Sequence, residues 1–512
     1  MSLKLYIPRD AAAKALGADE VVAAVKAEAA RRGVDVTIVR NGSRGMIFLE
    51  PLVEVERDGL RHAFGPVAAS DVASLFEAGW AQGHPLSQGL TEEIPYLKSQ
   101  TRLTFQRCGV IDPLSLGDYE ANGGLTGLRR ALTMTGAEIV AEVTESGLRG
   151  RGGAGFPTGI KWKTVAEAKA DQKYIVVNAD EGDSATFADR MIMEGDPFTL
   201  IEGMVIAGIA VGATKGYVYI RSEYPDAIEV MDKAVNNGRS LGLLGASVLG
   251  SGKVFDIEIR VGAGAYVCGE ETSLLNSLEG KRGIVRAKPP LPALQGFMGR
   301  PTVVNNVISL ATVPVIMERG AAFYKDFGLG RSRGTIPLQI AGNVKFGGLY
   351  ETAFGLSLGD IVEKIGGGTR SGRPVKAVQV GGPLGAYFPV SLFDTPFGYE
   401  EFGAKDGLIG HAGLTIFDDT ADMLKMARFA MEFCAIESCG KCTPCRVGAV
   451  RGVEVVDRSA AGDASAMPIL TDLCNTMKFG SLCALGGFTP YPVMSALTHF
   501  PDDFSRAKEA AE

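Results

Sequence analysis

Apolar and polar positions divide the chain into stretches with different predicted structures. Residues 1–110 begin with a short apolar run, LKLYI, followed by an Ala-rich helical pattern from about Val21 to Arg32. Two further apolar runs, VDVTIV and GMIFLEPLVEVE, have the character of strands. This order predicts a small α/β unit at the N-terminus.

The pattern changes twice more along the chain. In residues 111–330, helical segments alternate with the apolar runs KYIVVNADE, GYVYIRSEY and FDIEIRVGAG, which predicts an α/β sheet with ligands at its strand ends. Short strands and glycine turns in residues 331–415 predict a mostly β module with one helix near Leu358–Ile365. Residues 416–512 return to helical periodicity, so we expect a helical bundle there.

Length, composition and charge narrow the function classes. At 512 residues, 46% of them hydrophobic, the chain is long enough for three or four globular domains. A net charge of −7 argues against a nucleic-acid surface, which needs concentrated Lys and Arg. The most apolar run, Leu200–Ala213, contains Glu202 and is shorter than the ~20 residues of a membrane span, so we expect a buried core helix and no membrane insertion. The N-terminus lacks a secretory leader pattern, which favours the cytoplasm.

Six of the eight cysteines lie between Cys434 and Cys483. The spacing Cys439-x2-Cys442-x2-Cys445 is typical of three thiolates that hold a 4Fe-4S cluster together with a distant fourth cysteine. Zinc is the main competitor, but zinc sites usually use cysteine pairs, often with histidine, and no histidine lies nearby. The spacing therefore favours one 4Fe-4S cluster.

Spacing alone does not identify the fourth ligand among Cys434, Cys474 and Cys483. The first two lie in amphipathic helical patterns, where cysteine is commonly a small buried hydrophobe. Cys483 lies in the turn-like Gly480–Gly486, where backbone amides are free to point at sulfur, and it is our choice. Cys108 and Cys268 stand alone and are expected to be packing residues.

A glycine-rich segment, Gly150–Gly159, formally contains G-x-G-x-x-G. A dinucleotide fingerprint should follow a strand and open a helix. Here the preceding EIVAEVTESGLRG is helical, and we expect Phe-Pro-Thr-Gly not to continue as a clean helix. The loop still offers bare backbone for close approach, and Arg149, Arg151 and Lys161 offer positive charge, so we interpret it as a flavin or phosphate loop.

Three more segments carry polar groups suited to a site. Val177–Asp183 ends a predicted strand in an amide and three acids, and Gly262–Glu271 repeats this design after the next one. Asn305 and Asn306 add amides that suit a flavin's pyrimidine edge, although paired asparagines are as often turn residues.

The motifs GLRGRGGAGFPTGIKW, VNADEGD, GAGAYVCGEETSLLNSLEG, PTVVNNV and ESCGKCTPCRVG together resemble the NADH-binding flavoprotein subunit of complex I. The same core occurs in NAD-reducing hydrogenases and soluble NAD-dependent formate dehydrogenases. The resemblance implies an α/β multidomain fold. An atypical Rossmann-like domain for FMN and NAD(H) would span residues 111–330, followed by a β-grasp, SLBB-like module at 331–415 and a helical bundle with one 4Fe-4S cluster at 416–512. Residues 1–110 are similar to a thioredoxin-like 2Fe-2S domain but lack its cluster cysteines.

The resemblance also assigns site residues by motif position. Glu271 and Asp183 belong to the catalytic site, and Cys439, Cys442, Cys445 and Cys483 hold the cluster. Cofactor-binding positions are Gly150, Arg151, Gly152, Gly153, Phe156, Lys161, Asn178, Asp180, Glu181, Tyr266, Gly269, Glu270, Lys288, Asn305 and Asn306. Phe156 would stack on the nucleotide. The family often has Glu at position 183 and an aromatic residue at 164, where this chain has Asp and Thr.

The implied function is a diaphorase-type subunit, with no protein acid or base needed for hydride transfer. The cysteine-free N-terminal extension favours the formate dehydrogenase form, whose partners would be a 2Fe-2S thioredoxin-like subunit and a large molybdenum- or tungsten-binding iron-sulfur subunit. Complex I and NAD-reducing hydrogenase are the alternative hosts. A non-catalytic iron-sulfur scaffold and a zinc-binding adaptor are the alternative classes. Within the extension, Asn41–Met46 occupies the place of the missing ligands, so we expect a domain that docks a partner and holds no metal.

Overall fold

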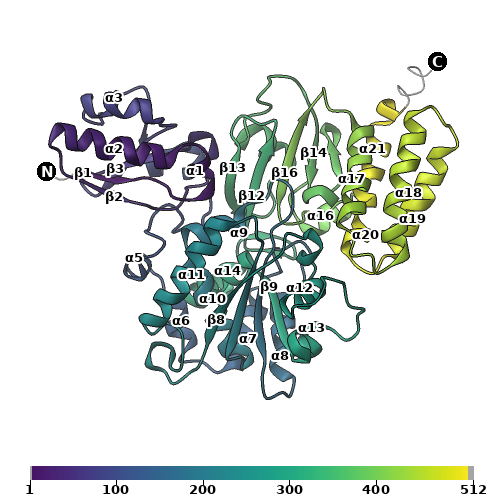
Figure 1. Cartoon of the computed structure of the whole chain (residues 1–512), viewed down its shortest axis with the longest axis horizontal. Coiled ribbons are helices and arrows are strands. Elements are labelled where there is room, and N and C mark those ends of the chain that lie inside the picture. Colours follow the sequence, from purple (N-terminus) through teal and green to yellow (C-terminus); the bar gives the residue numbers. More distant parts are fainter. Residues whose placement is uncertain (1–2, 505–512) are drawn as a thin grey trace.

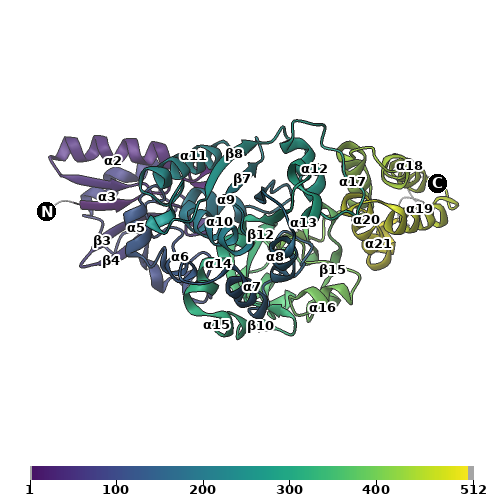
Figure 2. The same ribbon diagram turned by 90° about the horizontal axis from the view of Figure 1, so that it is seen from below.

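The computed structural model describes residues 3–504 of the chain. Its parts follow one another along an elongated molecule, with the N-terminal sheet at one end, two further sheets in the middle and a helical bundle at the other end (Figures 1 and 2). The predicted mixed α/β architecture with several sheets is confirmed. The names and boundaries of the four domains stay predictions.

The N-terminal sheet has the strand order β2-β1-β3-β4-β5, in which only β1 and β2 are parallel. Helix α2 packs on it through Val21 and Val25. The strands are β1 (Leu3–Tyr6), β2 (Val36–Val39), β3 (Val53–Arg57), β4 (Leu60–Phe64) and β5 (Ser87–Leu90). The helices are α1 (Ala11–Ala15), α2 (Ala18–Arg32), α3 (Val72–Glu77) and α4 (Pro95–Lys98), with 3-10 turns η1 (Ile47–Leu49), η2 (Ala69–Asp71) and η3 (Thr91–Glu93).

The prediction of one strand in the N-terminal unit is largely wrong. Of GMIFLEPLVEVE only the last part forms β3, whereas Ile47–Leu49 is a 3-10 turn. Pro51 has no backbone N–H to give to a ladder. The Glu50 carboxylate accepts hydrogen bonds from the Ser43 hydroxyl and the Leu52 amide, which turns the chain before β3 begins.

The second sheet is wholly parallel, with the order β8-β7-β6-β9. Its strands are β6 (Tyr174–Ala179), β7 (Lys215–Ile220), β8 (Asp256–Val261) and β9 (Thr302–Asn306), of which β9 was not predicted. The surrounding helices are α5 (Leu116–Ala121), α6 (Thr126–Ala131), α7 (Gly136–Glu145), α8 (Thr158–Glu167), α9 (Ala188–Gly195), α10 (Pro197–Val211), α11 (Pro225–Ser240), α12 (Glu271–Leu278), α13 (Pro292–Gln295), α14 (Val307–Arg319) and α15 (Ala321–Lys325). The 3-10 turns are η4 (Val248–Gly250), η5 (Tyr266–Gly269) and η6 (Phe297–Gly299).

Both faces of this sheet are covered. Ile175 and Val177 on one face of β6 belong to the core that contains α10 and α14, whereas Val176 on the other face belongs to the core shared with α12 and the C-terminal bundle. The predicted core helix is confirmed, because α10 is buried along nearly its whole length. Its Glu202 accepts hydrogen bonds from the Tyr119 hydroxyl and two backbone amides, which explains an acid inside an apolar helix.

The third sheet has the order β13-β12-β16-β14-β15, with β12 and β16 parallel and the other pairs antiparallel. Its strands are β12 (Thr335–Gly342), β13 (Gly348–Ala353), β14 (Val375–Val380), β15 (Tyr387–Pro389) and β16 (Gly413–Asp418). The predicted single helix is a short π-helix, η7 (Asp360–Ile365). A hairpin of β10 (Gly328–Leu329) and β11 (Ser332–Arg333), turns η8 (Gly382–Leu384) and η9 (Val390–Leu392), and helix α16 (Tyr399–Gly403) complete this part.

The C-terminal bundle, yellow in Figure 1, consists of α17 (Met423–Glu437), α18 (Thr443–Ala460), α19 (Ala466–Gly480), α20 (Ala484–Phe488) and α21 (Pro490–His499). It carries the cysteine loop between α17 and α18. Within residues 3–504, no helix combines the length and the apolar character that crossing a membrane requires.

Glu351 joins the third sheet to the segment that leads into the second. It is fully buried on β13, and its carboxylate accepts hydrogen bonds from the amides of Leu103, Thr104 and Phe105 at 2.9–3.0 Å and from the Thr335 hydroxyl at 2.6 Å. We expect Glu351→Ala to lower the free energy of unfolding by about 3 kcal/mol or more, because buried amides would lose their acceptor. Thermal and urea unfolding measure this.

The matched control is Glu120→Ala, which removes an exposed acid paired with Arg129. Its effect should stay within about 0.5 kcal/mol. Equal effects of the two substitutions would contradict the role assigned to Glu351.

Candidate functional site

Parallel pairing gathers polar strand ends at one edge of the second sheet. Asn178 at the end of β6 lies beside Asn306 at the end of β9, and Val177 lies beside Asn305. The chain leaves β6 directly into Asp180, so the amides and the first acid meet at the carboxyl edge, where open α/β sheets bind ligands. Asn305 and Asn306 are thus strand residues and do not form a turn.

A cavity of about 560 Å³ opens at this edge, within the usual range of small-molecule sites. Most of the predicted site residues line it: Gly150, Gly152, Gly153, Phe156, Lys161, Asn178, Asp180, Glu181, Asp183, Tyr266, Gly269, Glu270, Glu271, Lys288, Asn305, Asn306 and Cys483. Six segments distant in sequence therefore converge on one space. They are the glycine loop, the exits of β6, β8 and β9, the segment that carries Lys288, and the turn before α20.

The glycine loop leaves room for a flat ring. A Cβ built on Gly150 would find its nearest neighbour, the Phe156 carbonyl oxygen, at 3.6 Å, and one on Gly269 would find the Asp180 carbonyl oxygen at 3.5 Å. Side chains at these positions would meet no protein atom closer than ordinary contact and would lie at the cavity wall. Gly153 has φ +109°, a backbone conformation that favours glycine. The Phe156 ring is half exposed beside the loop, as a ring that stacks on a ligand should be.

The local structure around this loop differs in part from the prediction. The preceding segment is helix α7, as expected, but the following segment does become a helix. Pro157 serves as N-cap with φ −59°, a value the pyrrolidine ring favours, and α8 starts at Thr158. The loop thus connects two helices, and because no strand precedes it the G-x-G-x-x-G spacing is not a dinucleotide fingerprint.

Among the predicted cofactor-binding residues, Arg151 is the one whose side chain has a different role. Its side chain is 1% exposed, does not line the cavity, and donates hydrogen bonds to the carbonyls of Arg333 and Thr335 and to the Tyr324 hydroxyl. Arg149 is likewise engaged, with Gly155 and Glu400. These guanidinium groups fasten the loop to neighbouring segments, and of the three predicted cations only Lys161 lines the cavity.

Two acids at the start of α12 have different tasks. Glu270 is the N-cap and accepts the amide hydrogens of Thr272 and Ser273. Glu271 lies 2.8 Å from Lys288 Nζ and 3.4 Å from Lys161 Nζ. Burial would raise the pKa of Glu271, but the two ammonium groups outweigh it and hold the pKa below its usual range. Glu271 is therefore an ionised group between two lysines.

Asp180 and Asp183 are buried acids with different surroundings. Oδ2 of Asp180 is buried and has no hydrogen-bond partner among residues 3–504, and burial raises the pKa of Asp180 to about 7. Such an orphaned oxygen at a cavity wall fits a polar group of a bound ligand. Asp183 accepts a 2.7 Å hydrogen bond from the Tyr266 hydroxyl, and burial raises its pKa.

Among the ionisable residues that line the cavity, two were missed by sequence reasoning, Asp189 and His411. Asp189 lies within a helical pattern without any motif. His411 is one of only four histidines in the chain and lies between glycines at 410 and 413, which was a usable signal. Both lie next to Glu181.

The cysteines surround the start of two helices. Cys439 and Cys442 precede α18, Cys445 lies in its first turn, and Cys483 is the N-cap of α20. Cys483 also lines the cavity, and the amides of Leu485 and Gly486 point at its sulfur, as the turn argument predicted. These thiols fit a cluster site that is continuous with the cavity wall.

The other cysteines of the bundle are helical. Cys474 is buried within α19 and does not line the cavity. Cys434 on α17 contacts Cys445 with a sulfur-to-sulfur distance of 3.8 Å, and the hydrogen bond between them lowers the pKa of Cys445 to about 6.

Comparisons with known proteins match the two halves of this site. Residues 143–315 match the Nuo51 FMN-binding domain, and residues 425–507 match the NADH-ubiquinone oxidoreductase-F iron-sulfur binding region. The NADP-reducing hydrogenase subunit HndC of Solidesulfovibrio fructosivorans is 46% identical over 80% of this chain and 83% of its own length. An NADH-quinone oxidoreductase subunit of Rhizobium meliloti (strain 1021) is 46% identical over 76% of this chain and 93% of its own length.

The chain belongs to the 51-kDa-type NADH-binding flavoprotein family. A chain from the crystal structure of NAD+-reducing [NiFe]-hydrogenase in the air-oxidized state has the same fold, with a TM-score of 0.70 and 28% identity over 99% of this chain and 85% of that chain. The predicted family and cofactors, FMN, NAD(H) and one 4Fe-4S cluster, are confirmed. All predicted flavin-loop positions lie within the first matched region and all four predicted cluster cysteines within the second.

We expect Cys483→Ser to lose the 4Fe-4S cluster, because it removes the one predicted ligand outside the Cys439–Cys445 loop. Cys474→Ser should retain the cluster, because that sulfur lies within a helix and away from the cavity lining. Iron content and the electron paramagnetic resonance spectrum of the reduced protein measure both. Full iron in the first variant together with loss in the second would reverse the assignment.

Proposed function

We propose that this chain exchanges a hydride between NAD(H) and FMN and exchanges single electrons with partner subunits through its 4Fe-4S cluster. The observation that carries the proposal is that one cavity is lined by the glycine loop, by Glu270 and Glu271, and by Cys483. When bound, FMN supplies the chemistry that couples a two-electron hydride to single electrons. Because Cys483 lines the cavity, a cluster held by this cysteine would lie next to a flavin bound there.

The side chains that line the cavity bind and orient the ligands. Phe156 offers a half-exposed ring for stacking, and Lys161 and Lys288 offer positive charge to anionic groups of the ligands. Glu271 holds these two ammonium groups in place, and the Tyr266–Asp183 hydrogen bond fixes the opposite wall. The intact lining argues against a non-catalytic scaffold that has lost its nucleotide site.

The proposed host is a cytoplasmic NAD-dependent formate dehydrogenase, in which this chain reduces NAD. Formate would be oxidised on a large molybdenum- or tungsten-binding subunit, and a 2Fe-2S thioredoxin-like subunit would be a further partner. The absence of cysteine from residues 1–107, which leaves the N-terminal part without a set of cluster ligands, supports this assignment. A hydrogenase host is the second candidate, because the aligned NAD+-reducing hydrogenase chain covers 99% of this chain and so includes the N-terminal part as well.

We expect Glu271→Gln to lower kcat/KM for NADH about tenfold with an artificial acceptor such as ferricyanide, while the FMN content stays unchanged. The reason is that the two lysines lose the anion that positions them, an interaction of about 1.5–3 kcal/mol for a charged pair. Glu167→Gln, an exposed acid near the end of α8, is the control and should leave both quantities unchanged. Parallel loss of FMN and of NADH oxidation in the Glu271 variant would place this residue at the flavin instead.

The host is identified by purifying the native assembly through a tag on this chain. We expect a large molybdenum- or tungsten-containing subunit to co-purify and NAD reduction to depend on formate. NAD reduction driven by hydrogen, with nickel in the complex, would select the hydrogenase. Recovery with quinone-reducing membrane subunits would reject both hosts.

A further inference from the structure

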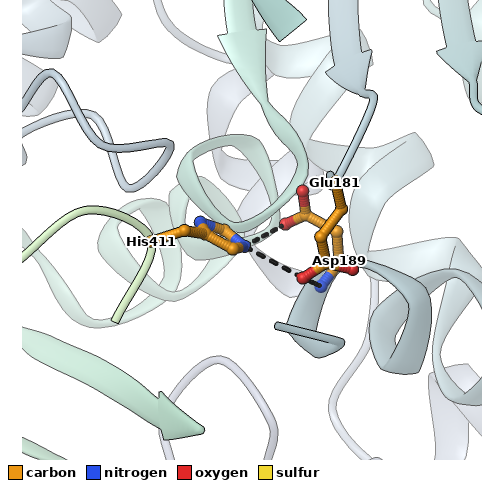
Figure 3. A group of neighbouring side chains, drawn as sticks. All are labelled: Glu181, Asp189 and His411. Carbon is orange, nitrogen blue, oxygen red and sulfur yellow. Dashed lines mark hydrogen bonds and ion pairs between the residues drawn. The ribbon is translucent and has the colours of Figure 1, made fainter. Parts of the chain in front are cut away.

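A buried histidine and two buried acids meet at the cavity wall. His411 Nε2 lies 3.2 Å from Glu181 Oε1 and 3.1 Å from Asp189 Oδ1 (Figure 3). On the other side of the ring, Nδ1 lies 2.6 Å from the Arg151 carbonyl oxygen in the glycine loop. The residues come from the exit of β6, from α9 and from the loop before β16, so His411 connects the second sheet, the third sheet and the glycine loop.

The contacts determine the charge of His411. A carbonyl oxygen only accepts hydrogen bonds, so Nδ1 carries a hydrogen. Glu181 already accepts hydrogen bonds from the amides of Asp189 and Arg190 and from the Tyr224 hydroxyl, which favours its ionised form. Nε2 therefore faces carboxylate oxygens and carries the second hydrogen.

The position of the His411 ring is consistent with a positive charge on it. Nε2 lies between the Glu181 and Asp189 oxygens, and neither contact alone has the alignment of a hydrogen bond. The two carboxylates therefore share the imidazole ring as their ion-pair partner. Burial would lower the pKa of His411, but Asp189 and Glu181 raise it well above its usual value. The trio then carries a net charge of about −1 instead of −2 when both acids are ionised.

A bound metal ion is the competing explanation, because the three side chains offer ligand atoms within 4.8 Å of one another. A metal would need the lone pair of Nε2. The contact distances of 3.1–3.2 Å are longer than those of a single charged N–H to one carboxylate oxygen, as expected for an N–H that two oxygens share. The experiment below includes metal analysis to separate these explanations.

We propose that His411 is a positioning residue that acts as a doubly protonated clamp, holding the glycine loop through the Arg151 carbonyl and compensating the charges of Glu181 and Asp189 beside the flavin. The effect on the flavin rests on the proposed function of the cavity. The clamp has two separable consequences. Its Nδ1 hydrogen fixes the loop, and its positive charge favours the reduced, more negative form of a bound flavin.

His411→Gln tests both consequences in the purified full-length chain. Without the positive charge, we expect reduced FMN to bind about tenfold more weakly relative to oxidised FMN, which lowers the two-electron midpoint potential by about 30 mV. Spectroelectrochemical titration measures this shift. His499→Gln at the end of α21 is the matched control, since it removes a histidine outside the cavity lining, and it should leave the potential unchanged.

The double variant His411→Gln/Asp189→Asn separates charge from simple damage. It removes one positive and one negative charge together, so we expect the potential to return to within about 10 mV of that of the unmodified chain, since 30 mV corresponds to a tenfold change in affinity ratio. A potential that stays unchanged in the single variant, or that does not recover in the double variant, would overturn the electrostatic role.

A second readout does not involve flavin. Arg151 is buried, and release of the glycine loop should expose the bonds after Arg149 and Arg151 to trypsin. We expect at least tenfold faster cleavage there in flavin-free His411→Gln than in flavin-free His499→Gln, mapped by mass spectrometry. Equal rates would overturn the clamp. Failure of the unmodified chain to bind FMN would reject the proposed function, but this comparison would still decide on the clamp.

Metal analysis completes the test. We expect no stoichiometric metal other than cluster iron in the unmodified chain. A divalent metal present at one equivalent in the unmodified chain and absent from His411→Gln would replace the clamp by a metal site.

Discussion

The parallel pairing of β6 with both β7 and β9 is the constraint on which the site depends. In this register Asn178 lies beside Asn306, and the chain leaves β6 with Asp180 at the same edge. A slip by one residue would turn the side chains of a strand to the opposite face. Because apolar residues on both faces of β6 are buried in different cores, such a slip would place the polar strand end in apolar surroundings. Packing of the sheet thus fixes the position of the polar groups at the cavity.

The second requirement is that the backbone of the glycine loop approaches the end of β9 closely. A glycine allows this approach because it has no side chain. A Cβ on Gly152 would lie 3.0 Å from Asn306 Cβ, so a larger residue would push the loop off the strand end. The loop is then held from outside by buried arginine contacts and from the third sheet by His411. The glycine loop therefore has little intrinsic preference for its shape, and contacts from other parts of the chain impose it.

The sequence predicted those features that depend on local pattern or on a motif. The core strands β6, β7 and β8, helix α10 and the cysteine helices follow from periodicity, and the cavity residues follow from motif position. Arg151 was misassigned because its charge suggested an anion site, whereas its partners are carbonyl groups nearly two hundred residues away. His411 was missed for the same reason, since its partners Glu181 and Asp189 lie just after β6 and on α9, and no local pattern indicates them. Local patterns in a single sequence do not reveal contacts between segments that are distant along the chain.

The N-terminal part shows how a segment at an expected ligand position can take a different task. Asn41–Met46 occupies the place where a 2Fe-2S domain would carry its ligands, and all six residues are buried within this chain. The Asn41 amide donates to the Gly109 carbonyl, and the Arg44 guanidinium pairs with Glu54 at 2.7 Å in a buried ion pair. Removal of one member of such a pair leaves an uncompensated charge, so this polar junction requires a defined geometry. A Cβ on Gly42 would lie 2.6 Å from Gly195 Cα on α9, so the segment also packs closely against the part of the chain that holds the second sheet.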